Sequence, residues 1–177
     1  MPTAAKQVQS QPATSIRLRP ATSDDWPMIR AWLRLPAIEA WWGPASICEG
    51  EVIAALQADA AMARIIEVDG RPVGYAHAID ASLWGDELPH GLPVGTWDLD
   101  LFVADPELRG RGVGSEALSQ LKSEVFATTL AVATCIFPSI ANERAVRAFE
   151  KAGFAYKSVW QDPTHGPCWF MLCERNP

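Results

Sequence analysis

The chain has 177 residues, 49% of them hydrophobic, and a formal net charge of −6 at pH 7. This size and composition indicate one soluble globular domain. The negative charge argues against a general nucleic-acid binder, which needs a basic surface to release counterions. No segment has the ~18 consecutive apolar residues of a membrane span, and no secretory signal is visible. We therefore expect a cytoplasmic protein with no nucleic-acid or membrane partner.

The first fifteen residues contain Ala, Pro, Gln, Ser and Thr with one charge and no apolar period. Such a segment is typical of a disordered leader, so we expect a leader at 1–15 and a single domain at 16–177. The cysteines lack the paired spacing of a zinc site, and we expect reduced thiols and no metal. They are Cys48, Cys135, Cys168 and Cys173.

Apolar periodicity and turn residues divide the domain into helices and strands. An Asp-Gly pair predicts a hairpin, and a helix between two later strands predicts a parallel crossover. We expect a mixed α/β (α+β) fold with a mostly antiparallel sheet of about seven strands and helices on both faces. The predicted strands are 16–19, 64–68, 72–79, 96–104, 130–137, 154–160 and 168–173. The predicted helices are 24–35, 51–61, 115–126 and 143–152, with an aromatic turn at 39–44 and an irregular loop at 81–94.

A glycine- and arginine-rich run follows the strand that ends near Val103 and opens the helix that begins near Ser115. Glycines let a backbone approach a ligand, and the N–H groups at a helix start favour an anion. The spacing Arg-x-x-Gly-x-Gly is neither the dinucleotide fingerprint nor a P-loop. The run therefore predicts a cradle for another phosphate ligand, although a plain strand-to-helix turn would have the same composition.

The glycine run, together with the later segment from Asn142 through Phe149 to Phe154, resembles the acetyl-CoA-binding core of the GNAT N-acetyltransferase superfamily. The resemblance implies a GNAT-like sheet, acetyl-CoA as co-substrate, a pyrophosphate held by the glycine loop and a pantetheine arm along the preceding strand. The cofactor-binding residues it implies are Phe102, Val103, Arg109, Gly110, Arg111, Gly112, Val113, Gly114, Ser115, Asn142, Ala145 and Phe149.

A narrower resemblance, to the aminoglycoside 6'-N-acetyltransferases, rests on the segments 31–43, 71–76 and 99–100. It implies antibiotic resistance and transfer to the 6'-amine of a cationic aminosugar, with Asp100 as an active-site carboxylate. An alkylammonium with a pKa of about 10 must lose a proton before it attacks a thioester, so a general base is required. The acceptor residues we expect are Trp41, Trp42, Tyr75, Asp86, Glu87, Asp98, Asp100 and Phe137.

Two positions depart from these families. Many superfamily members carry a tyrosine at the position of Phe149, where its hydroxyl protonates the departing thiolate, and phenylalanine has no such proton. The aminoglycoside enzymes carry an acidic residue at the position of Phe137, which cannot form that ion pair. The departing thiol is acidic enough to leave as its anion, since its pKa is about 8.5.

Two alternatives remain open at this point. The chain also resembles siderophore-type acyltransferases, which act on amines or hydroxylamines, but these carry a histidine at the position of Asp100. A catalytically inactive acyl-CoA-binding module would explain the two phenylalanines. A homodimer is compatible with the sequence, which does not determine the oligomeric state.

Overall fold

The computed structural model describes residues 14–163 and 165–176, except for the side chains of Asp86 and Glu87. The described residues form one seven-stranded sheet in the order β1-β2-β3-β4-β5-β7-β6. Every neighbouring pair is antiparallel apart from β4 and β5, which are parallel. The predicted mixed sheet is confirmed. Its strands are β1 (Ile16–Pro20), β2 (Ala61–Val68), β3 (Arg71–Asp80), β4 (Thr96–Val103), β5 (Ala133–Ile136), β6 (Ala155–Asp162) and β7 (Gly166–Glu174).

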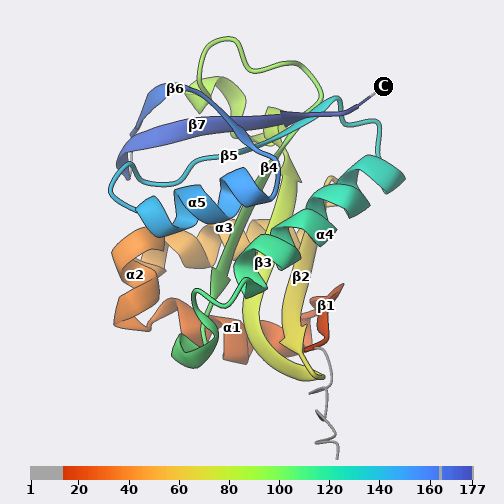
Figure 1. The fold of residues 1–177 in the computed structure, drawn as a ribbon, viewed down its shortest axis with the longest axis vertical. Coiled ribbons are helices and arrows are strands. Elements are labelled where there is room, and N and C mark those ends of the chain that lie inside the picture. Colours follow the sequence, from red (N-terminus) through yellow and green to blue (C-terminus); the bar gives the residue numbers. More distant parts are fainter. Residues whose placement is uncertain (1–13, 164, 177) are drawn as a thin grey trace, which may run out of the picture.

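Helices cover both faces of the sheet, with α4 and α5 on one side and α3 on the other (Figure 1). None of the helices in the described part of the chain is long and apolar enough to cross a membrane. The α-helices are α1 (Trp26–Leu33), α2 (Pro36–Trp42), α3 (Ala45–Gln57), α4 (Val113–Thr128) and α5 (Glu143–Lys151), and the 3-10 helices are η1 (Ser23–Asp25), η2 (Ala81–Glu87) and η3 (Pro106–Leu108).

Alternation along β4 divides the core in two. Leu99 is fully buried against α4 and α5, whereas Phe102 packs with α1, α2 and α3 on the opposite face. Side chains on successive strand residues point to opposite faces, so Asp98 and Asp100 share the face of Phe102. The alternation therefore directs two carboxylates to the face of the sheet that α1, α2 and α3 cover.

The region before β2 is more helical than expected. Pro36 begins α2 instead of ending a helix, because the first helical residue needs no N–H donor. The predicted aromatic turn therefore lies mostly in a helix that ends at Gly43, whose φ is 87°. The next helix spans Ala45–Gln57 rather than 51–61, since Pro44 starts it early and β2 begins at Ala61.

The predicted hairpin between β2 and β3 is confirmed, with positive φ angles at Asp69 and Gly70. Ser15 and Asp69 exchange two hydrogen bonds of 2.9 Å, one to the Asp69 carboxylate and one between backbones. Ser15, which the predicted leader contained, is therefore hydrogen-bonded to the hairpin. The leader's residues 1–13 lie outside the described residues.

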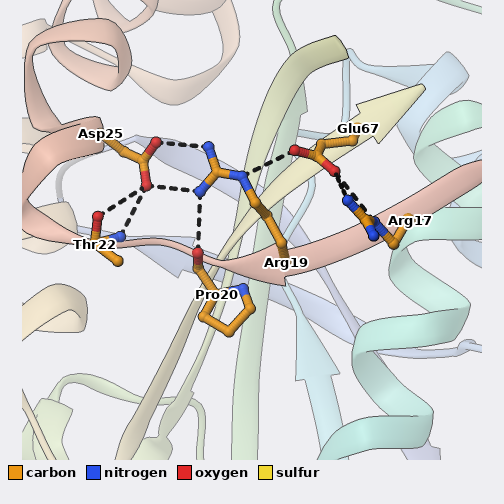
Figure 2. A network of polar contacts seen from close by, with 6 residues as sticks. All are labelled: Arg17, Arg19, Pro20, Thr22, Asp25 and Glu67. Atoms are coloured by element: carbon orange, nitrogen blue, oxygen red, sulfur yellow. Dashed lines mark hydrogen bonds and ion pairs between the residues drawn. The ribbon is translucent and has the colours of Figure 1, made fainter. Parts of the chain in front are cut away.

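An ion-pair network joins β1 to β2 and η1 (Figure 2). Arg19 donates from Nη1 and Nη2 to the carboxylate of Asp25, and from Nε to Glu67 at 2.9 Å. Arg17 bonds the other oxygen of Glu67 at 2.7 Å, and the amide of Thr22 bonds Asp25 at 2.9 Å. Asp25 and Glu67 are only 8% and 5% exposed. Each buried carboxylate thus has an arginine partner, which fixes the edge of the sheet.

Candidate active site

The sheet opens between β4 and β5. The two strands pair at three positions, from Thr96 with Ala133 to Asp98 with Cys135. Beyond Asp98, β4 continues to Val103 without β5 beside it. The edge of β4 that faces away from β3 therefore offers its backbone groups to a ligand instead of to a strand.

Backbone amides along β4 point alternately to its two edges. The amide of Ala104, directly after the strand, donates to β3 at 2.7 Å, so those of Val103 and Leu101 point to the opening. The Leu101 amide bonds the carboxylate of Asp100 at 2.7 Å. The amide of Val103 therefore lies on the open edge, whereas that of Phe102 faces β3.

A cavity of about 590 Å³ extends from this opening to the glycine turn before α4. Gly110 and Gly112 have φ angles of 78° and 87°, which residues with side chains rarely adopt. Gly112 is the N-cap of α4, whose first amides have no acceptor within the helix. The turn therefore presents donors suited to a phosphate. It lines the cavity with Arg109, Gly110, Gly112, Gly114 and Ser115.

Three residues of this turn that we expected to bind the cofactor have side chains that bond the protein, pack in the core or face solvent. Arg109 donates from Nε to the carbonyl of Val103 and from Nη2 to that of Ala104, both at 2.8 Å. Its guanidinium therefore ties the turn to the end of β4. Val113 is buried in the core beneath α4, and Arg111 is exposed. Neither Arg111 nor Val113 lines the cavity.

Helix α5 forms the opposite wall of the same cavity. Asn142 is its N-cap, and Oδ1 accepts from the amide of Ala145 at 3.1 Å. Asn142, Ala145 and the buried ring of Phe149, which the family resemblance assigns to the cofactor, line the cavity. Three cations that the sequence analysis missed line it too, and their i, i+3, i+7 spacing was a visible signal of one helix face. These are Arg144, Arg147 and Lys151.

Arg144 lies against the glycine turn. A Cβ atom at Gly110 would come within 2.5 Å of its Nη2 atom. The guanidinium is the end of a flexible side chain and can shift, so the positive φ is the physical reason for glycine at this position. The contact brings a positive charge from α5 next to the donors before α4, which strengthens the attraction for a phosphate.

A second cavity, of about 410 Å³, lies on the α2 and α3 side of the opening. Five acidic residues from four elements line it, which is a concentration of negative charge suited to a cation. Among the described residues, no group of three or more His, Cys, Asp or Glu side chains is arranged to hold a metal ion. The acidic residues are Glu39, Glu51, Asp98, Asp100 and Asp162.

The electrostatics of Asp98 and Asp100 follow from burial. Burial raises the pKa of Asp98 to about 8, and the charge of Glu51 adds to the shift. Burial also raises the pKa of Asp100 well above its ordinary value, with the charge of Asp98 as the second cause. The pKa of Glu51 is raised by burial and then by Asp162. These carboxylates hold a proton more firmly than an exposed carboxylate, which suits a base.

Aromatic side chains separate the two cavities. Trp42 is 9% exposed and donates from Nε1 to the carbonyl of Leu101 at 3.3 Å, whereas Trp41 is 48% exposed. Phe137 stacks on Phe170 with ring centroids 5.6 Å apart. Both tryptophans and Phe137, which we expected to bind the acceptor, line both cavities.

His165, which the sequence analysis did not consider, closes one side of the acidic cavity. Its Nδ1 lies 3.2 Å from a carboxylate oxygen of Asp162, and its Nε2 lies 3.0 Å from the carbonyl of Trp42. Both neighbours are hydrogen-bond acceptors, and the imidazole ring lies between them. The contact joins the β6–β7 turn to the end of α2.

The other residues that we expected to bind the acceptor do not line either cavity in the described part of the chain. Tyr75 is fully buried between Trp42 and Phe102 and lines neither cavity, so the structure does not bring it to the site. The side chains of Asp86 and Glu87 lie outside the described residues. His77 also lines the acidic cavity, and burial lowers its pKa to about 4.

A family model described as an acetyltransferase (GNAT) domain matches residues 21–161. The chain belongs to this GNAT acetyltransferase family. The split between β4 and β5 and the glycine turn are therefore parts of an acetyltransferase that uses acetyl-CoA, as the sequence analysis expected.

Individual members of the family are also similar to this acetyltransferase. The aminoglycoside N(6')-acetyltransferase type 1 of Klebsiella pneumoniae is 28% identical over 174 residues, which cover 92% of this chain and 84% of that protein. A crystal structure of the aminoglycoside acetyltransferase AAC(6')-Ib with coenzyme A has a TM-score of 0.80 at 28% identity, over 91% and 95% of the two chains. Another, with coenzyme A and kanamycin, also has a TM-score of 0.80, at 27% identity over the same shares.

Proposed function

We propose that this acetyltransferase transfers the acetyl group of acetyl-CoA to a primary amine of a cationic aminosugar, of the aminoglycoside kind. The observation that carries the proposal is the meeting of two cavities at Asp100, one lined by helix-start amides and cations and the other by five acidic residues. The first suits a phosphorylated donor and the second a polycationic acceptor. The names of the similar proteins support this acceptor class.

The groups along the larger cavity fit coenzyme A. The glycine turn and Ser115 would hold the pyrophosphate through backbone amides, while Arg144 and its neighbours on α5 would add positive charge. The open edge of β4 offers the amide of Val103 as a donor, and its carbonyl oxygens can each accept one further hydrogen bond from the amide groups of a pantetheine arm. Asn142 keeps an amide nitrogen available, since its oxygen caps α5.

We assign Asp100 as the general base. It lines both cavities, so it lies where the acceptor amine would meet the thioester. The acceptor ammonium gives up a proton, and the neutral nitrogen attacks the carbonyl carbon. The amide of Val103, on the open edge of β4, is suited to stabilise the developing oxyanion. Asp98 and Glu51 would bind further ammonium groups of the acceptor and keep the Asp100 pKa high.

Trp41 and Trp42 would provide flat apolar walls against which a sugar ring packs. Phe137 extends this wall on the β5 side, in place of an ion pair. The acidic charge of this cavity comes instead from α3 and β6, through Glu51 and Asp162. The absence of a carboxylate at position 137 is therefore compatible with a cationic acceptor.

The test is thiol release from acetyl-CoA with a panel of amines. We expect turnover with kanamycin and other aminosugars, little with neutral monoamines, and loss of turnover in Asp100→Asn with coenzyme A binding retained. Faster turnover of hydroxylamines than of aminosugars would favour the siderophore-type alternative. Tight coenzyme binding without turnover of any amine would indicate a binding module and refute the proposal.

A further inference from the structure

Five residues line both cavities, and the reacting atoms must meet among them. Their side chains are aromatic apart from one carboxylate and one hydroxyl, those of Asp100 and Ser139. The five are Trp41, Trp42, Asp100, Phe137 and Ser139. Acetyl transfer needs a group that accepts the amine proton and a donor that stabilises the sulfur anion as it leaves. Asp100 has the first role in the proposed function, and the second has no residue yet.

Ser139 is held rigidly on the far side of the opening from Asp100. It follows β5 and forms an isolated β-bridge with Cys168 of β7. On either side of it, the carbonyl of Pro138 and the amide of Ile140 bond the backbone of β7, at 2.9 and 3.2 Å. The Asp100 carboxylate and the Ser139 hydroxyl therefore lie on opposite sides of the gap between β4 and the segment after β5. A thioester would lie in this gap.

The hydroxyl of Ser139 has a proton that it can donate. Its Oγ accepts from the amide of Ala141 at 3.4 Å, so the O–H proton is available to another acceptor. The indole N–H of Trp42, the nearest alternative at the junction, donates to the carbonyl of Leu101. Phe149 lines the same cavity but has no polar hydrogen.

We propose that the Ser139 hydroxyl donates a hydrogen bond to the sulfur of coenzyme A as the acyl group departs. The amine nitrogen forms a bond to the carbonyl carbon, and the C–S bond breaks with its electron pair going to sulfur. The proton lost by nitrogen goes to Asp100. Ser139 keeps its own proton, because an alcohol is less acidic than a thiol, and the thiolate regains a proton from Asp100 or water to leave as the free thiol.

This inference rests on acetyl transfer but not on the identity of the acceptor. It can therefore be tested with coenzyme A alone. Thiolate absorbs in the ultraviolet, so a titration of bound coenzyme A, corrected for the protein without ligand, gives the pKa of the bound thiol. We expect Ser139→Ala to raise that pKa by about one unit, a ten-fold change, since a charge-assisted hydrogen bond is lost.

Ser139→Thr retains the hydroxyl and should titrate like the wild type. Ser123→Ala, on the exposed side of α4, is the matched control for removal of a serine hydroxyl. Equal thiol pKa values in the wild type and Ser139→Ala would overturn the proposal.

Steady-state rates with two acceptors give an independent readout. Thiolate departure is common to all acceptors, so Ser139→Ala should lower kcat by the same factor, about ten-fold, with kanamycin and with hydroxylamine. The KM for acetyl-CoA should stay unchanged. A loss with kanamycin alone would assign Ser139 to acceptor binding and overturn the inference. A wild type that acetylates hydroxylamine but not kanamycin would refute the proposed acceptor. The ratio of kcat between the wild type and Ser139→Ala would still be measured with hydroxylamine and would still test the role of Ser139.

Discussion

Two clusters of buried carboxylates in the same sheet have opposite electrostatics. At the β1 edge, hydrogen bonds from Arg19 lower the pKa of Asp25 to about 2. In the middle of the sheet, burial raises the pKa of Asp98 to about 8 and that of Asp100 well above its ordinary value. Among the described residues, no lysine or arginine forms an ion pair with Asp98 or Asp100.

The comparison shows that partners, more than burial, decide what a buried carboxylate does. Asp25 is 8% exposed, and its charge is matched by a guanidinium and two bonds from Thr22. Such a group stabilises the fold and has no capacity left for a ligand. Asp100 has one backbone bond, a hydrogen bond with the Trp42 side chain and a carboxylate neighbour, but no guanidinium. It costs folding stability, and that cost is what leaves a site able to take up a proton and attract a cation.

The largest expected effect is the loss of activity in Asp100→Asn. An amide cannot accept the amine proton, so we expect kcat to fall by about a hundred-fold or more. Asp25→Asn, the matched change in the other cluster, should keep kcat within two-fold once its folding is ensured. The measurement is thiol release under saturating substrates. Equal losses in the two variants would show that the clusters do not divide into structural and catalytic roles.

The second prediction concerns stability. Asp25→Ala should lower the free energy of unfolding by about 2 kcal/mol at neutral pH, because charged hydrogen bonds from Arg19 are lost. The folded-state pKa of Asp25 is depressed, so its stabilisation is present above the ordinary value of 3.8 and is lost as the pH falls toward about 2. Urea unfolding of the wild type and the variant across this range should converge at the acid end.

The pH dependence of stability has the opposite sign for Asp100. The pKa of Asp100 is raised, so its contribution is fully favourable below its ordinary value of 3.8 and is lost as the pH rises through the raised value. We therefore expect Asp100→Asn to be more stable than the wild type at neutral and alkaline pH and equal to it in acid. The same urea series measures this difference. Destabilisation of Asp100→Asn at neutral pH would contradict it.

A third prediction is a shifted pH profile in Asp98→Asn. The base must be ionised, so kcat/KM rises with pH through the raised pKa of Asp100. Removing the charge of Asp98 lowers that pKa, and the acid limb should move down by about one pH unit. The profile of kcat/KM against pH checks this. An acid limb at the same pH in the wild type and Asp98→Asn would show that Asp98 does not raise the pKa of the base.

The smallest effect on activity is expected from the loss of a cation on α5. Arg144→Ala should raise the KM for acetyl-CoA several-fold with little change in kcat, since it removes a charge beside the phosphate-binding turn. The increase should shrink at high salt because exposed charges are screened. Arg34→Ala, which pairs with Glu49 away from both cavities, is the control. A salt-independent rise in KM would indicate a packing effect instead.

Local patterns predicted the parts of this protein that depend on a few neighbouring residues. The Asp69–Gly70 turn, the cap at Asn142 and the face of Asp100 follow from turn chemistry, capping and strand alternation. The helix at 36–42 did not, because a proline that can begin a helix also can end one. The role of Arg109 depended on carbonyls at the end of β4, contacts that no spacing rule describes.

The sequence by itself determined the fold class and the acetyltransferase family, and it indicated Asp100 as the carboxylate that we propose as the base. It did so because these reside in contiguous motifs whose backbone and side-chain requirements are local. Only the tertiary structure brought Glu51, Asp162 and His165 to one cavity, and Ser139 to the junction opposite Asp100. These residues come from elements far apart in the chain, and their proximity depends on the divergence of β4 from β5, which no local pattern specifies.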